Sequence, residues 1–525
     1  MKFVVSLFFL FLAGWMSAQN TPPSVTIASV SADEVAQTIT VNYSIEDADS
    51  DNFGVWVKIA ADGGEFFEVV SNDQLSGDVG DNLTSALGSL TWDYSSFAGN
   101  VGDVRFMVVA TDYAEVSIAD MVAQVDEAQL LAYLTGIVGE RHYQANPNHL
   151  EEVRNYIATA FNAASLSTDD HGFVHANTAM RNIIGRKAGM RDEAVTYVID
   201  GHFDGVPGSP GADDNGSAVA GVLEALRILS QYHFEHSLRF IGFDAEELGL
   251  IGSLRYVQNG IKPYEEIAGV LNFEMIGYYD DAPNSQLLPA GFDLLFPSAA
   301  QAIIDDEYRG NFITVVGNTA SNPLIAAYES AAETYVPELR AISVAVPGNG
   351  SIAPDLRRSD HARFWDGGFQ ALMLTDGADF RNFNYHTPDD VIETLDFTFM
   401  ANVVKATLAT AAELAIPISA GSAVTDLDGL VAVTEHSHDR QWEVKLFPNP
   451  GDGLLSLMVN NSDRAFRARL EVYDLSGREL HSSLALFTHG TSGTRLDLRH
   501  LAEGSYILVV NTPELSRSVG FVVKR

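Results

Sequence analysis

The chain has 525 residues, more than one ordinary hydrophobic core organises, so two or three domains are expected. Hydrophobic residues make up 46% and charged residues 19%, a balance typical of packed globular proteins. The net charge of −39 argues against nucleic acids and anionic membranes as partners, because both require a basic surface. Cysteine is absent, so disulfides and thiolate ligands are excluded, and any metal must be held by imidazole and carboxylate groups.

The N-terminus has the pattern of a secretory signal peptide, predicted over residues 1–19. Lys2 precedes an apolar run from Phe3 to Ala13, and the small residues Ser17 and Ala18 follow. This run is too short to cross a membrane as a helix, and no other segment approaches the required apolar length. We therefore expect a secreted chain without membrane insertion.

Residues 20–122 form short runs of alternating apolar and polar side chains with turn residues between them. The clearest predicted strands are Thr38–Tyr43, Val55–Ile59 and Val104–Ala110. Short strands at this spacing are typical of a β-sandwich of the immunoglobulin or fibronectin type III kind.

Residues 123–417 change to helices that alternate with continuous apolar strands. Apolar residues have helical spacing from Asn148 to Phe161, and a second helix is predicted from about Ser217 to Ser230. Strands are predicted at Ala194–Asp200, Leu238–Asp244 and Gly269–Phe273. This order predicts an α/β fold with a mostly parallel sheet that helices cover on both faces.

Acidic and histidine side chains gather after these predicted strands. They are His202, Asp204, Asp213, Asp214, Glu246, Glu247 and Glu274, with His386 farther along. Ligands of open α/β sheets bind beyond the carboxyl ends of the strands. Peptide hydrolysis needs an activated water and a polarised carbonyl, and two metal ions about 3.5–4 Å apart supply both. The residues predict a two-metal hydrolase centre, although the sequence leaves open which member of Asp213–Asp214 and of Glu246–Glu247 points inward.

Small and polar residues from 418 to 442 predict a linker, and residues 443–525 return to an all-β pattern. The final segment is therefore expected to form a small β-sandwich of its own.

The ordered motifs of the central region resemble the co-catalytic di-zinc aminopeptidases, a family that includes bacterial leucyl aminopeptidases, glutamate carboxypeptidase-like enzymes and glutaminyl cyclases. The motifs are His202-x-Asp204, Pro210-Gly211-Ala212-Asp213-Asp214-Asn215-x-Ser217, Glu246-Glu247-x-Gly249 with Gly252-Ser253, Asn272-Phe273-Glu274-Met275-Ile276-Gly277, Ser359-Asp360-His361 and Tyr385-His386-Thr387-x-Asp389. The resemblance covers residues 125–415 and implies a zinc-exopeptidase-like fold.

Carried over to this chain, the resemblance implies two zinc ions. Asp214 would bridge them. His202 and Glu274 would complete the site of one ion, and Glu247 and His386 would complete the other.

The resemblance also implies supporting roles around these ligands. Glu246 would be the general base, which takes a proton from the attacking water and passes it to the leaving amine. Asp204 would orient the first histidine, and Ser359 or Asp360 would orient the second. The peptide bond after the bridging aspartate is often cis in this family.

The chain departs from the family pattern at three positions. Glu274 replaces the commoner aspartate and remains an oxygen ligand, while Ala218 replaces a usual glycine. Leu356 stands where the family has a tyrosine that stabilises the oxyanion. The remaining candidates for that role are Arg357, Arg358 and Tyr385.

The C-terminal segment resembles a type IX secretion sorting domain. The residues that carry this resemblance are Leu446-Phe447-Pro448-Asn449-Pro450, Val472-Tyr473-Asp474-Leu475-Ser476-Gly477-Arg478, Leu496-Asp497-Leu498 and Gly504-Ser505-Tyr506. A carbohydrate-binding module is the competing interpretation. The sorting domain implies the type IX machinery as a partner and an extracellular or cell-surface location.

Together these features predict a secreted zinc exopeptidase that acts on peptides or proteins, and an aminopeptidase in particular. A single-zinc glutaminyl cyclase is one alternative, although it has less need of both His202 and Glu274. An inactive hydrolase-fold adhesion protein is another, although it predicts loss of a ligand or of Glu246, and none is missing.

Overall fold

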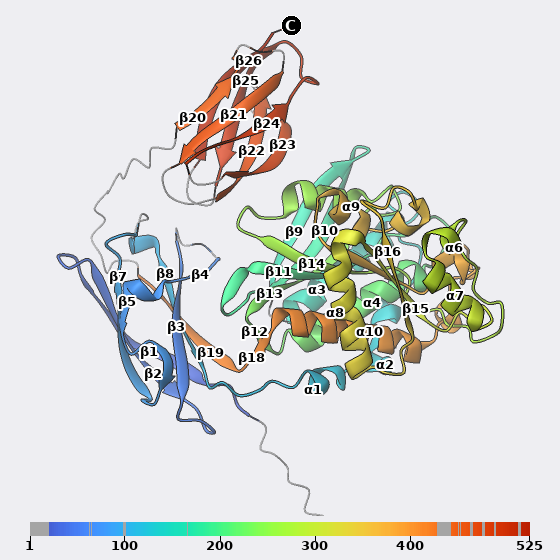
Figure 1. Cartoon of the computed structure of the whole chain (residues 1–525), viewed down its shortest axis with the longest axis horizontal. Helices are drawn as coiled ribbons and strands as arrows, with labels where there is room; N and C mark the ends of the chain where they lie inside the picture. The colour runs from blue at the N-terminus through green and yellow to red at the C-terminus, as the bar shows by residue number, and fades with distance from the viewer. Residues whose placement is uncertain are drawn as a thin grey trace, which may run out of the picture.

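The computed structural model describes residues 20–427 except 62, 63, 65, 98–100 and 165, and residues 443–524 except 450, 452, 462–465, 475–477, 488, 489 and 513–515. The predicted signal peptide and residues 428–442 of the predicted linker lie outside these ranges. Figure 1 shows a β-sandwich, a central α/β part and a C-terminal β-sandwich.

The N-terminal sandwich is built from two sheets whose inward side chains share one core. The first sheet has the order β1 (Ser24–Asp33), β2 (Thr38–Glu46), β7 (Leu87–Asp93) and β5 (Leu75–Gly77). The second has the order β19 (Ala420–Asp426), β8 (Arg105–Thr111), β3 (Phe53–Ala60) and β4 (Glu68–Val69), with β6 (Gly80–Leu83) also on β3. Val41, Trp92 and Phe106 lie in the common core, as alternating strands predict.

The strand β19 corrects the predicted linker. Residues 420–426 pair antiparallel with β8 along its whole length, so the chain returns to the N-terminal sandwich after the central part (Figure 1). Leu427 is buried in the core of this sandwich. Small residues such as Ala420, Gly421 and Ser422 suggested a linker, but an edge strand needs no strong apolar pattern when only one face is covered.

The central sheet has eight strands. Their order is β16 (Ala341–Val346), β15 (Ile313–Asn318), β17 (Ala371–Thr375), β14 (Glu266–Phe273), β11 (Asp192–His202), β13 (His236–Phe243), β10 (Thr178–Lys187) and β9 (Ser167–His175). The middle strands β17, β14, β11 and β13 run parallel, whereas β9, β10 and the β15–β17 pair are antiparallel. The predicted α/β class is confirmed, with a sheet more mixed than expected.

Helices cover both faces of this sheet, and each face has its own hydrophobic core. One face is covered by α1 (Ile118–Val122), α2 (Glu127–Ile137), α3 (Pro147–Ala163), α4 (Ala218–Leu229), α8 (Asn322–Tyr335) and α10 (Phe397–Ala415). The other is covered by α5 (Ile251–Arg255), α6 (Phe292–Leu295), α7 (Pro297–Asp305) and α9 (His361–Asp366). Side chains cap several helices: Asn146 accepts the His149 N–H at the start of α3, and Asp396 accepts the Phe399 N–H at the start of α10.

The N-terminal sandwich docks on the central part through buried polar contacts. The Lys58 ammonium donates to the Gly189 carbonyl at 2.7 Å and pairs with the Glu193 carboxylate at 3.2 Å. Trp56 donates its indole N–H to the Met190 carbonyl at 2.9 Å. Glu193 lies near the start of β11, so the sandwich sits at the amino end of that strand.

The C-terminal part is a second β-sandwich. One sheet contains β20 (Glu443–Phe447), β21 (Leu454–Asn461) and β24 (Gly490–Asp497). The other contains β23 (Glu479–Phe487), β22 (Phe466–Asp474), β25 (Gly504–Asn511) and β26 (Ser516–Val523). A two-stranded pair, β12 (His233–Phe234) with β18 (Pro417–Ile418), completes the strands of the described chain.

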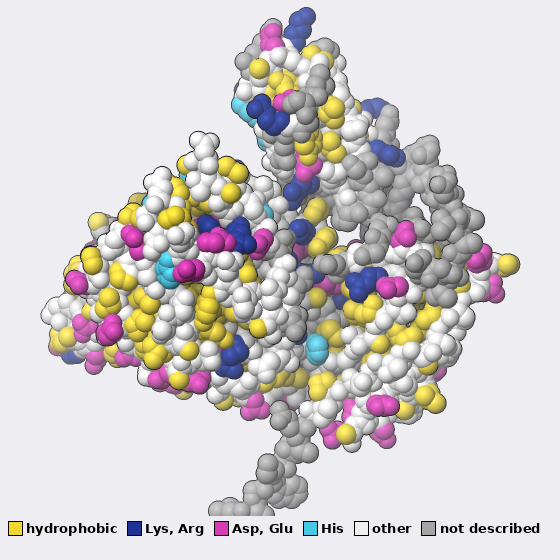
Figure 2. Space-filling view, turned by 180° about the vertical axis from the view of Figure 1, so that it is seen from behind, with side chains coloured by type: hydrophobic (Ala, Val, Ile, Leu, Met, Phe, Trp, Pro, Cys, Tyr) yellow, Lys and Arg dark blue, Asp and Glu magenta, His cyan; other side chains and the backbone are white. Residues whose placement is uncertain are grey.

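Among the described helices, none has the length and apolarity needed to cross a membrane. Figure 2 shows acidic side chains dispersed over one face of the molecule rather than gathered into a single patch.

Candidate metal centre and active site

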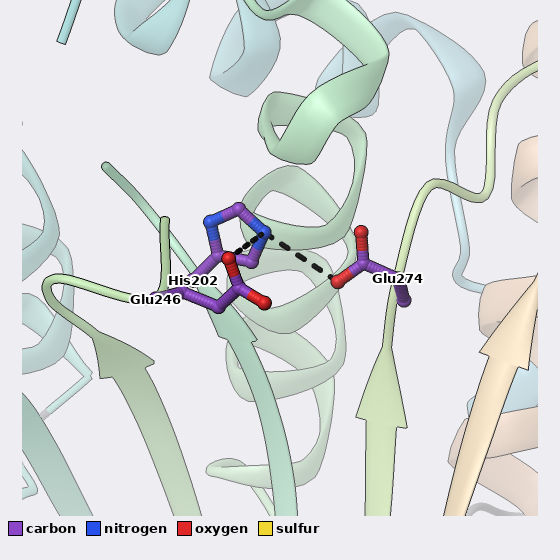
Figure 3. A group of neighbouring side chains, drawn as sticks. All are labelled: His202, Glu246 and Glu274. Atoms are coloured by element: carbon purple, nitrogen blue, oxygen red, sulfur yellow. Dashed lines mark ion pairs between the residues drawn. The ribbon is translucent and has the colours of Figure 1, made fainter. Parts of the chain in front are cut away.

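The candidate ligands come from neighbouring parallel strands at their carboxyl ends. His202 is the last residue of β11, Glu246 and Glu247 follow β13, and Glu274 comes directly after β14. Figure 3 shows His202, Glu246 and Glu274 pointing toward one another from these positions. Parallel pairing of β11 with both neighbours therefore brings together residues that lie up to 72 positions apart.

The first group consists of His202, Glu246 and Glu274, all buried, with ligand atoms within 4.8 Å of one another. His202 Nε2 lies 3.4 Å from Glu274 Oε2 and 3.8 Å from Glu246 Oε2. One imidazole nitrogen thus faces two carboxylates in a space from which water is largely excluded.

The second group consists of Asp214, Glu247 and His386, again within 4.8 Å of one another. His386 Nε2 lies 2.9 Å from Asp214 Oδ2 and 3.4 Å from Glu247 Oε1. The other Asp214 oxygen, Oδ1, lies 3.5 Å from His202 Nε2. Asp214 therefore joins the two groups, with one oxygen toward each histidine.

Asp213 is turned away from both groups. Its Oδ1 accepts the Gly277 N–H at 2.9 Å, and its Oδ2 accepts the Asn382 side-chain amide at 2.8 Å. The structure thus places Asp214, rather than Asp213, with the candidate ligands. The Asp214–Asn215 peptide bond is cis, in agreement with the family resemblance.

Asp204 holds the turn that carries the two glutamates. Its carboxylate oxygens accept the backbone N–H groups of Glu246 at 2.9 Å and Glu247 at 3.2 Å. His202 Nδ1 lies 3.2 Å from the Asp204 backbone carbonyl and 3.6 Å from its carboxylate. Asp204 therefore supports His202 from the side opposite Nε2 and also fixes both glutamates, which the sequence did not predict.

Ser359 and Asp360 lie beside the first group, so their predicted role toward His386 is corrected. The Ser359 hydroxyl donates to Glu274 Oε2 at 2.6 Å. Burial, together with the charges of Glu274 and Asp204, raises the pKa of Asp360 to about 7, although the charge of His202 opposes them. A short loop before α9 delivers both residues to the end of β14 rather than to the loop of His386.

Two supporting residues had not been predicted. Asp390 accepts the backbone N–H groups of Asp213 at 2.8 Å and Asp214 at 3.1 Å, which holds the turn before α4. Arg141 is fully buried and bonds the backbone carbonyls of the segment between His202 and Asp214. Neither belongs to the motifs that resemble the family, because their partners are backbone groups with no sequence signature. The position of Asp390, directly after the motif residue Asp389, was the only hint.

Glu246 and Glu247 retain protons more strongly than isolated carboxylates. Burial raises the pKa of Glu246 well above its ordinary value, and the charge of Glu274 adds to this although His202 opposes it. Burial and, to a smaller extent, the charge of Asp214 raise the pKa of Glu247 to about 7. Burial lowers the pKa of His386, but hydrogen bonds to Asp214 and Glu247 outweigh burial and raise it to about 10. Metal ions compete with these protons, so binding would release them.

The donor set fits zinc. It offers two imidazole nitrogens and carboxylate oxygens only, which are ligands that zinc accepts. Glu247 Oε1 is buried and lies 3.4 Å from His386 Nε2, so a carboxylate oxygen and an imidazole nitrogen of the second group face each other as two ligands of one cation would. Asp214, with an oxygen toward each group, is placed to serve two ions.

A cavity adjoins the first group. The cavity is open to solvent, and Glu274 and Tyr385 line it at the metal end. Farther from the metal centre its walls are largely apolar, with Phe292, Ile303, Phe312, Leu356 and Met373.

The three oxyanion candidates occupy different places. Arg357 pairs with Asp366 at 2.8 Å, away from the cavity. Arg358 lines the cavity and donates to the Tyr385 hydroxyl at 3.1 Å and to Asp379 at 3.0 Å. The Tyr385 ring stacks on His386 with centroids 3.7 Å apart. Arg358 and Tyr385 therefore remain candidates on geometry.

Comparison with known proteins finds separate matches for the central α/β part and for the C-terminal sandwich. Residues 182–411 match Peptidase family M28, and residues 445–524 match the secretion system C-terminal sorting domain. The predicted sorting domain is thus confirmed, and a carbohydrate-binding module has no support.

Individual relatives cover different shares of the chain. YfbL of Escherichia coli (strain K12), an uncharacterized protein, is 30% identical over 285 residues, which are 52% of this chain and 82% of that protein. Aminopeptidase YwaD of Bacillus subtilis (strain 168) is 40% identical over 104 residues, 19% of this chain and 23% of that protein. The solved LapA aminopeptidase of Legionella pneumophila is 20% identical with a TM-score of 0.46, over 58% of this chain and 76% of that one. The chain belongs to peptidase family M28, and it carries a secretion-system sorting domain at its C-terminal end.

Proposed function

We propose that the chain is a secreted two-zinc aminopeptidase that releases residues from the N-termini of peptides. The position of Asp214 carries this proposal, because its two oxygens face two different histidines at 3.5 and 2.9 Å. One carboxylate between two imidazoles is what a bridged pair of ions requires. His202 and Glu274 would complete the coordination of one zinc ion, and Glu247 and His386 would complete that of the other.

Bound zinc ions supply Lewis acidity toward the scissile carbonyl and toward the attacking water. Glu246 then serves as the general base at its Oε atoms, since it is the carboxylate of the first group left over once His202 and Glu274 are assigned as ligands. Burial favours the protonated form of Glu246, so after accepting the proton it can hold it until the amine leaves.

Tyr385 is the proposed donor to the oxyanion. Its hydroxyl lies at the metal end of the cavity, and Arg358 donates to that hydroxyl, which leaves the Tyr385 proton free to point toward substrate. Burial raises the Tyr385 pKa, so the hydroxyl stays protonated and able to donate at neutral pH.

The apolar cavity beside Glu274 would hold the side chain of the N-terminal residue. Phe292, Phe312 and Met373 favour a large apolar side chain over a charged one, because a charge buried there would lose its hydration. Secretion would follow from the predicted signal peptide and from the sorting domain, with the type IX machinery as partner.

The central test replaces the proposed base. Glu246→Gln removes the proton acceptor while keeping size and polarity, so turnover of leucine-4-nitroanilide should fall roughly 100- to 10,000-fold. Zinc content, measured by atomic absorption, should stay at two ions per chain. Glu247→Gln is the matched neighbour and should instead lower the zinc content, because it alters a proposed ligand.

Unchanged turnover in Glu246→Gln would rule out the base assignment. One zinc per wild-type chain, together with cyclisation of N-terminal glutamine, would favour the glutaminyl cyclase alternative. Absence of both reactions from a zinc-loaded chain would favour the adhesion alternative.

A further inference from the structure

Arg141 is a buried cation whose contacts set it apart. It lies between α2 and α3, and its side chain is fully enclosed. Its guanidinium donates to six backbone carbonyls, those of Pro210 at 2.7 Å, Phe203 and Gly211 at 2.8 Å, Gly139 at 3.0 Å, Ile137 at 3.3 Å and Asp214 at 3.4 Å. Within the described part of the chain, none of its hydrogen bonds reaches a carboxylate.

Four of these six carbonyls, those of Phe203, Pro210, Gly211 and Asp214, belong to a segment with candidate ligands at both ends. The segment runs from Phe203, directly after His202, to Asp214. Nε bonds its first residue, and Nη2 bonds Gly211 and Asp214 at its end. The Arg141 backbone adds a further bond, since its carbonyl accepts the Gly205 N–H at 3.0 Å.

The segment is shaped to let the guanidinium approach. Gly211 has φ +61°, and a Cβ there would lie 2.6 Å from Arg141 Nη2 and 2.4 Å from the Asp214 carbonyl oxygen. Any other residue would push the guanidinium away from the Asp214 turn. Close contact between Arg141 and this turn therefore requires glycine at position 211.

We propose that Arg141 is a positioning residue of the metal centre, which sets the distance between His202 and Asp214 by holding both ends of the segment that joins them. A guanidinium suits this task because its five N–H groups lie in one rigid plane. Lysine has three donors on one atom and cannot span the same carbonyls. The inference rests on the proposed two-zinc function and adds a residue that is neither a ligand nor in contact with substrate.

The test compares zinc affinity with stability. Arg141→Met removes the hydrogen-bond donors, and Arg141→Lys keeps the positive charge but loses the planar set of five N–H donors. Zinc dissociation constants are measured by competition with a chromophoric chelator, and thermal unfolding is followed with chelator and with zinc. Both variants should bind zinc roughly 10- to 100-fold more weakly, and zinc should raise their unfolding midpoints less than that of the wild type.

Arg239→Met is the matched control. Arg239 is also buried, lies on β13, and donates to Glu265 and to the Tyr256 hydroxyl, away from the metal centre. This variant should lose stability while its zinc affinity stays at the wild-type value.

Each result decides the matter. Wild-type zinc affinity in Arg141→Met overturns the inference, as does an equal loss of affinity in Arg239→Met. Wild-type zinc affinity in Arg141→Lys also overturns the inference, because the positive charge rather than the planar set of N–H donors would then maintain zinc binding. If Arg141→Met fails to fold, the lysine variant decides by the same comparison. A wild-type chain that binds no zinc overturns the proposed function and the inference together, whereas normal wild-type binding isolates the role of Arg141.

Discussion

The two histidines of the candidate metal centre face one carboxylate but differ in their access to solvent. The His202 side chain is 1% exposed, whereas that of His386 is 34% exposed. His202 ends a buried strand, while His386 stands on a loop with φ +57° beside Tyr385. Solvent therefore reaches the candidate site from the His386 side.

A third histidine links folding to pH. His361 is buried, its Nε2 bonds the Leu356 carbonyl at 3.1 Å, and its ring packs edge-on against Trp365. Burial lowers its pKa to about 3, against 6.5 for an unperturbed histidine. Below pH 6.5 the unfolded chain binds a proton that the folded chain refuses, so this contribution to stability is full above pH 6.5 and is lost as pH falls toward 3.

His361→Phe should remove this dependence. We expect the variant to be less stable at pH 7.5, because the Leu356 carbonyl loses its donor, but its stability should fall less steeply below pH 6.5. The difference in slope should approach about 1.4 kcal/mol per pH unit near pH 5. Urea unfolding of both proteins between pH 4.5 and 7.5 measures it, and parallel curves would contradict the prediction.

Candidate ligands could be predicted because they lie in recognisable sequence motifs. Residues whose hydrogen bonds go to backbone groups could not be predicted. His202, Asp214 and His386 could be predicted because their types and order match a family, and the structure brings all three together. Arg141 and Asp390 bond backbone atoms 62 and 177 positions away. Every residue offers the same backbone groups, so no sequence pattern points to such partners.

At the scale of elements, the metal centre depends on how closely β11 approaches the start of α4. A Cβ on Gly201, the residue before His202, would lie 2.9 Å from the Ala218 Cβ. The Asp214 turn leads directly into α4. The close approach of Gly201 to Ala218 therefore also sets the spacing between β11, which carries His202, and the turn that carries Asp214. The family's usual glycine at position 218 would leave more room here.

This contact predicts a rescue by a second substitution. Gly201→Ala should force β11 and α4 apart and cost about 1–3 kcal/mol of stability, with loss of zinc from the His202–Asp214 pair. The double variant Gly201→Ala with Ala218→Gly should bind zinc again. Its free energy of unfolding should remain roughly 1 kcal/mol below that of the wild type, because glycine destabilises a helix. Zinc content and urea unfolding test both proteins. Failure of the double variant to regain zinc would locate the strain elsewhere.

Strands and helices were predictable where burial is continuous or periodic, as in β11, β13, β14 and α3. The antiparallel edge of β9 and β10 was not, because pairing direction depends on how the chain connects the strands rather than on their composition. The sequence of β19 contains mostly small and polar residues, so its pairing with β8 depends on a sheet edge more than 300 positions earlier.

At the scale of the whole molecule, the N-terminal sandwich and the metal centre lie at opposite ends of β11. Glu193, the partner of Lys58, is nine residues from His202, or about 30 Å along an extended strand. The sandwich therefore stabilises the base of the central sheet, and none of its described side chains belongs to the candidate ligand groups.

Lys58→Met should separate stability from catalysis. Glu193 would keep Arg186 at 2.6 Å but lose a buried cation, so we expect a cost of about 3 kcal/mol. Because the metal centre lies at the far end of the strand, turnover by the zinc-loaded variant at 25 °C should equal that of the wild type. Reduced turnover with full zinc content would show that the sandwich shapes the active site.

The return of β19 to the N-terminal sandwich sets a limit on maturation. If the sorting domain is removed after export, a cut before Ala420 would strip an edge strand and the buried Leu427 from the first sandwich. A cut between Leu427 and Glu443 would release the tail and leave that sandwich whole. The mature enzyme would then end with the strand that ties its last residues to its first domain.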